Sequence, residues 1–193
     1  MLTLTLDTNC LVALEENRPA ASGVRALLEQ HDAGLAQVRF AATTAAERRR
    51  DGEYLPNFGF FQARLKAAGL DHLELVKPVA ILGLTYSDWC VVAGDHDHVE
   101  LRRIHDVLFS SPYDYGQAVP ADIDEVDRQK AEHKWRNRRL DGLGLHCHIR
   151  SGGDAYVTSD ENFVKATKQA PLAALGAKLI FSPEEAAAYG LHT

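Results

Sequence analysis

Short apolar strands alternate with helical segments at both ends of this chain, and this alternation restricts the fold more than any other feature. Residues 2–6, LTLTL, have the period-two pattern of a strand. The expected strands are 2–6, 35–41, 155–159 and 178–182, and the expected helices among them are 19–31, 161–170 and 183–190. This order predicts parallel βαβ units and an α/β fold, a three-layer α/β/α sandwich around a central, mainly parallel sheet.

The middle of the chain is less regular. Two apolar runs in 71–94, HLELV and DWCVVAG, have the composition of strands, and 110–120 has the Pro, Gly and Ser content of a loop. Helical patterns are expected at 43–50, 57–69, 98–109, 121–139 and 141–151. We therefore expect one domain over 1–193, with a helical insertion at about 78–135.

Composition narrows the class of protein. The chain has 193 residues, of which 46% are hydrophobic and 25% are charged, the balance of an ordinary globular domain. No apolar run approaches the ~18 residues of a membrane span, and the first residues lack the basic and apolar regions of a signal peptide. Three widely spaced cysteines favour a reducing compartment. We expect a cytoplasmic protein with no membrane contact.

Acidic residues stand where expected strands end or helices begin. Asp7 follows the first strand, and Asp160 follows the strand at 155–159. Glu47 lies in the helix after strand 35–41, and Asp141 opens the expected helix 141–151. Ligands of parallel sheets bind at the carboxyl ends of the strands, so these four side chains are expected to converge.

Four neighbouring carboxylates repel one another unless a cation lies among them. Hard oxygen ligands suit Mg²⁺ or Mn²⁺, and such an ion activates water and stabilises charge on phosphate oxygens. The four acids therefore predict a magnesium or manganese site that supports phosphodiester hydrolysis.

Several segments together resemble a PIN domain: LDTN at 6–9, TTAAE at 43–47, LDGLGLHCHIRSGGDAYVTSDENF at 140–163 and LIFSPEEA at 179–186. The resemblance implies a metal-dependent ribonuclease, in some members a toxin paired with an antitoxin. It gives the catalytic and metal-binding roles to Asp7, Glu47, Asp141 and Asp160. It also implies supporting roles for Thr8, Asn9, Thr158 and Asn162. Asn162 departs from the pattern, because many members have a second Asp there.

Basic residues are expected to bind RNA although the net charge is −6. One group directly follows Glu47, and the other ends beside Asp141. The expected RNA-binding residues are Arg48, Arg49, Lys134, Arg136, Arg138 and Arg139. The other interpretation of the second group is that it complements the dipole at the end of a helix. An RNA substrate is the expected partner, an antitoxin or another protein is a further candidate, and a homodimer is compatible with the sequence.

Other interpretations stay open. Glu47, Asp141 and Asp160 also suit helix capping, and an inactive PIN-fold module could bind RNA or protein. A haloacid-dehalogenase-type phosphatase is disfavoured, because Asn9 stands where that chemistry needs an acid. The HCH triplet at 146–148 is a weak zinc signal, because alternate helical residues do not face one ligand. A second metal at Asp95–His98 is an alternative to a solvated loop.

Overall fold

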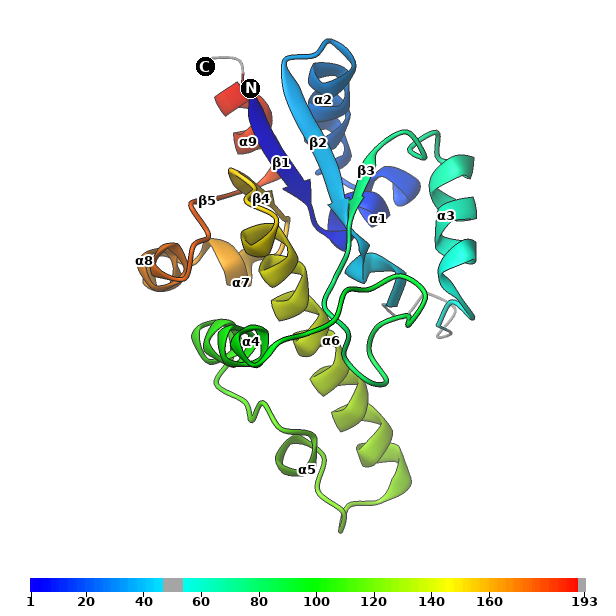
Figure 1. Ribbon diagram of the computed structural model, residues 1–193, viewed down its shortest axis with the longest axis vertical. Helices are drawn as coiled ribbons and strands as arrows, with labels where there is room; N and C mark the ends of the chain where they lie inside the picture. The colour runs from blue at the N-terminus through cyan, green and yellow to red at the C-terminus, as the bar shows by residue number, and fades with distance from the viewer. Residues whose placement is uncertain (47–53, 191–193) are drawn as a thin grey trace.

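A five-stranded parallel sheet forms the centre of the computed structural model, which describes residues 1–46 and 54–190 (Figure 1). Among these residues the strand order is β3-β2-β1-β4-β5, and every pairing is parallel. The strands are β1 (Leu2–Leu6), β2 (Ala36–Ala41), β3 (Glu74–Val76), β4 (Ala155–Val157) and β5 (Leu179–Phe181). The predicted α/β class and parallel sheet are confirmed.

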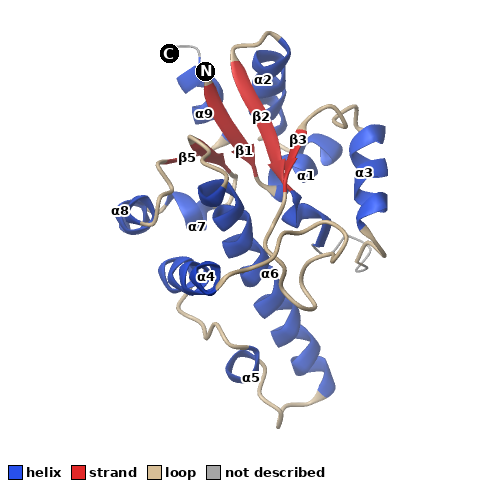
Figure 2. Ribbon diagram, viewed as in Figure 1, coloured by secondary structure: helices blue, strands red, loops and turns tan. Residues whose placement is uncertain are grey.

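Helices lie on both faces of the sheet, an arrangement compatible with the predicted three-layer sandwich (Figure 2). The helical elements are α1 (Thr8–Glu16), α2 (Ala21–Asp32), the 3₁₀ helix η1 (Ala42–Ala46), α3 (Phe58–Ala67), α4 (Asp95–Leu108), α5 (Tyr115–Ala118), α6 (Glu125–Arg150), α7 (Glu161–Val164), α8 (Ala166–Ala174) and α9 (Pro183–Gly190). Each helix of the described segments is too short or too polar to cross a bilayer.

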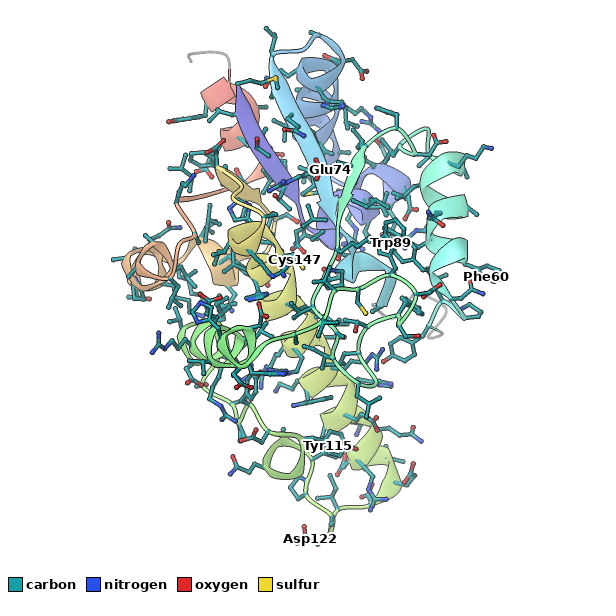
Figure 3. All side chains as sticks on the ribbon, viewed as in Figure 1. Phe60, Glu74, Trp89, Tyr115, Asp122 and Cys147 are labelled. Carbon is teal, nitrogen blue, oxygen red and sulfur yellow. The ribbon has the colours of Figure 1, made fainter. Side chains whose placement is uncertain are left out.

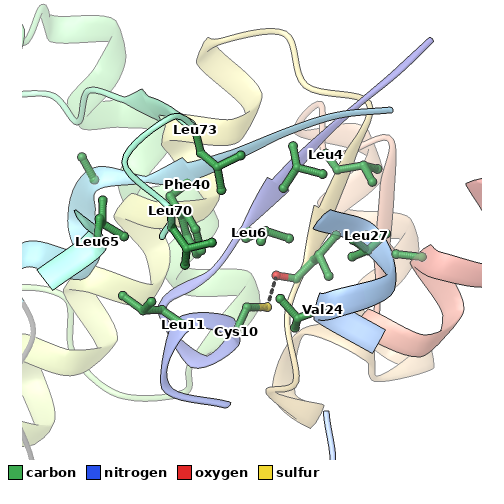
Figure 4. Close-up of a cluster of buried hydrophobic side chains, with 14 of the residues drawn as sticks. Leu4, Leu6, Cys10, Leu11, Val24, Leu27, Phe40, Leu65, Leu70 and Leu73 are labelled. Carbon is green, nitrogen blue, oxygen red and sulfur yellow. Dashed lines mark hydrogen bonds between the residues drawn. The ribbon is translucent and has the colours of Figure 1, made fainter. Parts of the chain in front are cut away.

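Alternating residues of β1 explain how the sheet separates two environments. Leu4 and Leu6 point toward the α1–α2 side and are almost completely buried with Leu11 and Leu27 (Figure 4). Thr5, between the two leucines, faces α6 instead, where its hydroxyl lies 3.0 Å from Nδ1 of His148. The apolar face holds the sheet to α1 and α2, and the other face can receive polar groups.

Helix α6 is a single element of 26 residues, so the prediction of two helices, 121–139 and 141–151, is wrong. The expected start at Asp141 lies inside the helix, which stays continuous where Gly142 faces Ile104 of α4 and Gly144 packs closely against Tyr156 of β4. Its amino-terminal half projects away from the sheet with α5 (Figure 1). There the labelled Tyr115 lies beside α6, and its ring centroid is 5.0 Å from that of Trp135 (Figure 3). The segment predicted as an insertion thus contains α4, α5 and the start of α6.

Three further expectations differ from the structure. Helix α1 was not expected, because its polar start resembles a loop. The run 88–94 forms no strand and contributes one bridge, between Val79 and Val91. The expected helix 161–170 is two helices, α7 and α8, because the backbone at Lys165 is not helical.

Candidate functional site

Asp7 lies at the carboxyl end of the central strand β1. Its side chain is 6% exposed, and its backbone N–H donates to the carbonyl of Val157 at the end of β4, over 3.0 Å. Oδ1 of Asp7 accepts the backbone N–H of Thr8 over 2.8 Å, so Asp7 is also the N-cap of α1. The strand pairing therefore fixes this carboxylate at the sheet edge where ligands of parallel sheets bind.

Thr158 joins two of the predicted acids. Its hydroxyl donates to Oδ2 of Asp7 over 2.8 Å and accepts the backbone N–H of Asp160 over 3.1 Å. Asn9 donates through Nδ2 both to Oδ2 of Asp7, over 2.9 Å, and to the Thr158 hydroxyl, over 2.8 Å. The structure thus brings Asp7, Asn9, Thr158 and Asp160 together, in agreement with the predicted grouping.

Asp160 begins α7 and caps it. Its Oδ1 accepts the backbone N–H of Asn162 over 2.8 Å, so the capping interpretation holds for one oxygen of this carboxylate. The side chain of Asn162 turns elsewhere, because Nδ2 donates to the carbonyl of Leu108 over 3.0 Å and Oδ1 accepts from Lys168. Asn162 therefore supports Asp160 through its backbone and ties α7 to the end of α4.

Asp141 reaches the site from the interior of α6, and not from a helix start as predicted. The capping interpretation of Asp141 is therefore wrong, because the turn before it is already helical. Gly144, one turn later, permits the close approach of the helix. A Cβ atom there would lie 2.8 Å from the hydroxyl oxygen of Tyr156 and 3.9 Å from Oδ1 of Asp7. The hydroxyl oxygen of Thr43 in η1 would lie 3.3 Å from the same Cβ atom.

Burial and neighbouring negative charge raise the pKa values of Asp7 and Asp141. Burial, and then the negative charges of Asp7 and Asp160, raise the pKa of Asp141 to about 8, although the cation of Arg138 opposes the change. Burial also raises the pKa of Asp7, against the hydrogen bonds from Thr158, Thr8 and Tyr156, and the charge of Asp160 adds to the increase. The carboxylates of Asp7, Asp141 and Asp160 thus form one electrostatic unit, called here the carboxylate centre.

The chemistry of the carboxylate centre suits a hard divalent cation, although among the described residues only Asp97, Glu100 and His146 bring three ligand atoms within 4.8 Å of one another. The three carboxyl groups follow β1, lie inside α6 and precede α7, and burial with like charge opposes the ionisation of Asp7 and Asp141. A divalent cation would reverse that opposition, because it attracts each carboxylate and replaces lost hydration with direct oxygen ligands. Mg²⁺ and Mn²⁺ prefer such all-oxygen sites.

The fourth predicted acid, Glu47, lies outside the described residues, as do Arg48 and Arg49. The described chain before them ends with η1, whose Thr43 is 1% exposed and borders Gly144. The role of Glu47 in the centre therefore stays a prediction.

The basic residues of α6 have different surroundings. Lys134 is exposed. Arg136 donates to the carbonyls of Gly83 and Ala46, and Arg139 is buried with its guanidinium 3.6 Å from the ring centre of Tyr113. Arg136 and Arg139 therefore hold the protein's own backbone or rings, and the guanidinium of Arg138 lies 5.5 Å from the ring centre of Phe109. Of the four basic side chains of α6 that were expected to bind RNA, only Lys134 is exposed.

A pocket of about 580 Å³ opens beside Asp160 and contains two cations, Lys165 and Lys168, that the sequence interpretation missed. Arg138, Lys165 and Lys168 line it together with Asp160 and the 106–110 segment. Lys165 and Lys168 follow Asp160 closely along the chain, and that proximity is the signal that could have revealed them. The pocket places positive charge next to the carboxylate centre.

The HCH triplet does not form one site, as expected from helical geometry. His148 faces Thr5 on the sheet, Cys147 packs in the apolar cluster with Leu101, and His146 faces α4.

Comparisons of this chain with protein-family models, with curated proteins and with solved structures found no match.

Proposed function

We propose that this chain is a PIN-like ribonuclease that depends on Mg²⁺ or Mn²⁺ and hydrolyses RNA phosphodiester bonds. The observation that carries the proposal is that Asp7, Asp141 and Asp160, from three distant parts of the chain, approach closely enough near the carboxyl edge of a parallel sheet for Asp7 and Asp160 to raise the pKa of Asp141. The Thr158 hydroxyl links the Asp7 carboxylate to the backbone N–H of Asp160, and Asp141 is half-buried. A structural role for three such acids would leave their like charges unbalanced.

The resident residues have separate tasks in this proposal. Asp7, Asp141 and Asp160 would hold the metal ion, with Glu47 as the fourth expected ligand. Thr158 and Asn9 orient the Asp7 carboxylate by hydrogen bonds of 2.8 and 2.9 Å. A bound ion would supply activation of water and charge stabilisation at the phosphate.

The pocket beside Asp160 supports an RNA substrate. Arg138 and Lys165 offer phosphate contacts close to the acids, and Lys168 adds positive charge while it donates to Asn162 and to the carbonyl of Leu108. Phe109 lines the same pocket with an aromatic ring. Cations attract the RNA backbone, and aromatic rings can stack with unpaired bases. A single-stranded substrate therefore suits this surface.

Three further expectations stay predictions: an antitoxin or other protein partner, a homodimer and a cytoplasmic location.

The experiment is a cleavage assay with end-labelled single-stranded RNA. We expect products with Mg²⁺ or Mn²⁺ and none in EDTA. Asp7→Asn and Asp160→Asn should each reduce the rate at least ~100-fold, because each removes a metal ligand. Asp154→Asn is the matched control. That acid lies at the opposite end of β4, where it accepts the backbone N–H of Thr3 and pairs with Lys178.

The alternative is a catalytically inactive PIN-fold module. RNA binding with no metal-dependent cleavage would support that alternative and contradict the enzyme. Cleavage that persists in EDTA, or that survives in both Asp7→Asn and Asp160→Asn, would place the activity outside the carboxylate centre.

A further inference from the structure

A second group of ligand-type side chains lies between α4 and α6. Asp97 and Glu100 are one turn apart on α4, and His146 faces them from α6. One ligand atom from each of the three residues lies within 4.8 Å of the other two. Packing of the two helices brings together residues that the sequence separates widely.

His146 is buried and aimed at both acids. Its side chain is 1% exposed, and Nε2 lies 3.4 Å from Oδ1 of Asp97 and 3.4 Å from Oε2 of Glu100. These distances exceed the usual 2.7–3.2 Å of an N–H···O hydrogen bond. Within residues 1–46 and 54–190, neither ring nitrogen of His146 has a well-formed hydrogen bond. A buried polar nitrogen without such a bond is costly, and a bound cation would provide its partner.

The electrostatics also favour a cation at this point. Burial lowers the pKa of His146, against the charges of Asp97 and Glu100 and a hydrogen bond with Glu100, which raise it. Two carboxylates thus converge on a buried imidazole. Arg150 offers partial compensation, because its Nε is 3.4 Å from Oδ1 of Asp97 and its side chain is 44% exposed. A divalent ion would balance both acids and use the imidazole nitrogen as a ligand.

The ligand types, together with two of the three spacings, suggest which ion fits. Zn²⁺ binds imidazole nitrogen and carboxylate oxygen at about 2.0–2.2 Å in a tetrahedral arrangement, which separates neighbouring ligand atoms by about 3.4 Å. Both N···O distances of His146 have this value. An octahedral ion with the same bond lengths would separate adjacent ligands by only about 3.0 Å, and Ca²⁺, whose bonds are longer, takes oxygen ligands and not imidazole.

We propose that Asp97, Glu100 and His146 form a tetrahedral Zn²⁺ site with its fourth position open to water. Neighbouring groups hold the acids ready: Oδ2 of Asp97 accepts the backbone N–H of Gly94 over 2.8 Å. The other oxygen of Glu100, Oε1, lies 3.1 Å from Nε2 of His96. The ion would fasten α4, in the middle segment, to the helix that carries Asp141, and it is independent of the proposed nuclease activity.

The test uses Co²⁺ as a spectroscopic substitute for Zn²⁺ in the full-length chain. The Asp160→Asn variant is the host, because it weakens ion binding at the carboxylate centre. We expect one equivalent of Co²⁺ to give the intense visible absorption of tetrahedral coordination, and Zn²⁺ to abolish it. Zn²⁺ should also raise the melting temperature, because it binds only the folded state.

Variants identify the ligands in the same host. Glu100→Gln and Asp97→Asn should each weaken Co²⁺ binding more than ~10-fold, because each loses an anionic ligand. Asp95→Asn, which removes an equal charge from the same turn of α4, should bind nearly as tightly as the host. Absence of the tetrahedral spectrum in the host would overturn the site, and so would unchanged affinity in Glu100→Gln and Asp97→Asn. Neither result depends on RNA cleavage, so failure here is distinct from failure of the proposed nuclease.

Discussion

The carboxyl group of Asp141 holds its proton at neutral pH, partly because the charge of Asp7 acts on it across the carboxylate centre. Burial makes the largest contribution, the charge of Asp7 comes next, and together with Asp160 they bring the pKa of Asp141 to about 8. Asp7 thus follows the central strand and Asp141 lies inside a long helix, yet their ionisation is linked. Stability, metal binding and pH dependence should all reflect this link.

The metal-free protein should lose stability between about pH 4 and pH 8 through Asp141. The folded pKa of about 8 lies above the ordinary value of 3.8, so the folded state binds more protons in this window. A rise in pH therefore favours the unfolded state, by on the order of a few kcal/mol at pH 8. Asp141→Asn removes the titration. In EDTA the variant should gain stability over wild type as pH increases, with little difference near pH 4.

Urea unfolding at several pH values measures this effect. Asp154→Asn is the control: hydrogen bonding from Thr3 and the charge of Lys178 lower the pKa of Asp154 from its ordinary 3.8, so the difference between this variant and wild type should stay nearly constant from pH 4 to pH 8. A difference between wild type and Asp141→Asn that stays constant from pH 4 to pH 8 would contradict the raised pKa.

Mn²⁺ binding should release a proton near pH 7. Asp141 is mostly protonated there and must ionise to become a ligand, so the metal displaces its proton. Calorimetric titrations in two buffers with different ionisation enthalpies give the number released. We expect close to one proton at pH 6.5–7 and a value falling toward zero above pH 9. Release that does not change with pH would show that Asp141 is not a ligand.

Two glycines of α6 make a matched pair for testing the close approach of this helix. In Gly144→Ala the new Cβ would lie 2.8 Å from the Tyr156 hydroxyl, which borders Asp7, so α6 or Tyr156 must shift. We expect at least ~10-fold weaker Mn²⁺ binding. In Gly142→Ala the nearest contact is an ordinary 3.7 Å to Ile104, so metal binding should persist and stability should rise by up to about 1 kcal/mol. Equal metal affinity in both variants would argue against tight packing at Gly144.

The cations beside Asp160 should control RNA affinity. Neutralising Arg138, Lys165 and Lys168 should weaken binding, and each lost phosphate contact should reduce the slope of log K against log salt by roughly 0.7–1. Lys178→Gln removes a cation at the opposite edge of the sheet and serves as the control. Fluorescence anisotropy with Ca²⁺ in place of Mg²⁺ measures binding with cleavage suppressed. An unchanged slope of log K against log salt in the triple variant would show that this pocket does not contact RNA phosphates.

The local sequence pattern was sufficient to predict much of the sheet. The strands β1, β2, β4 and β5 alternate or concentrate apolar residues, and polar residues at their ends marked Asp7 and Asp160 correctly as neighbours. The same local rules failed at α6, where Asp141 suggested a helix start. The cost of glycine in a helix is only about 1 kcal/mol, and packing against Tyr156 leaves no room for a side chain at Gly144.

The local sequence pattern could not predict which helices contact each other. His146 gave a weak zinc signal with its neighbour His148, because only packing of α4 on α6 reveals its proximity to Asp97 and Glu100. Similarly, Arg139 resembled an RNA-binding cation until its position over the Tyr113 ring was known. Periodicity indicates which face of a helix is apolar but not which helix covers it.

The most direct test of the central claim, that Asp7, Asp141 and Asp160 hold one divalent cation, is a crystal structure of the protein soaked in Mn²⁺ at about pH 8.5, where Asp141 is largely ionised. The anomalous signal of manganese locates the ion independently of any assumption about ligands. We predict a peak about 2.0–2.4 Å from carboxylate oxygens of all three residues, with Glu47 as the expected fourth ligand. Manganese bound elsewhere on the molecule, with none among Asp7, Asp141 and Asp160, would contradict the account.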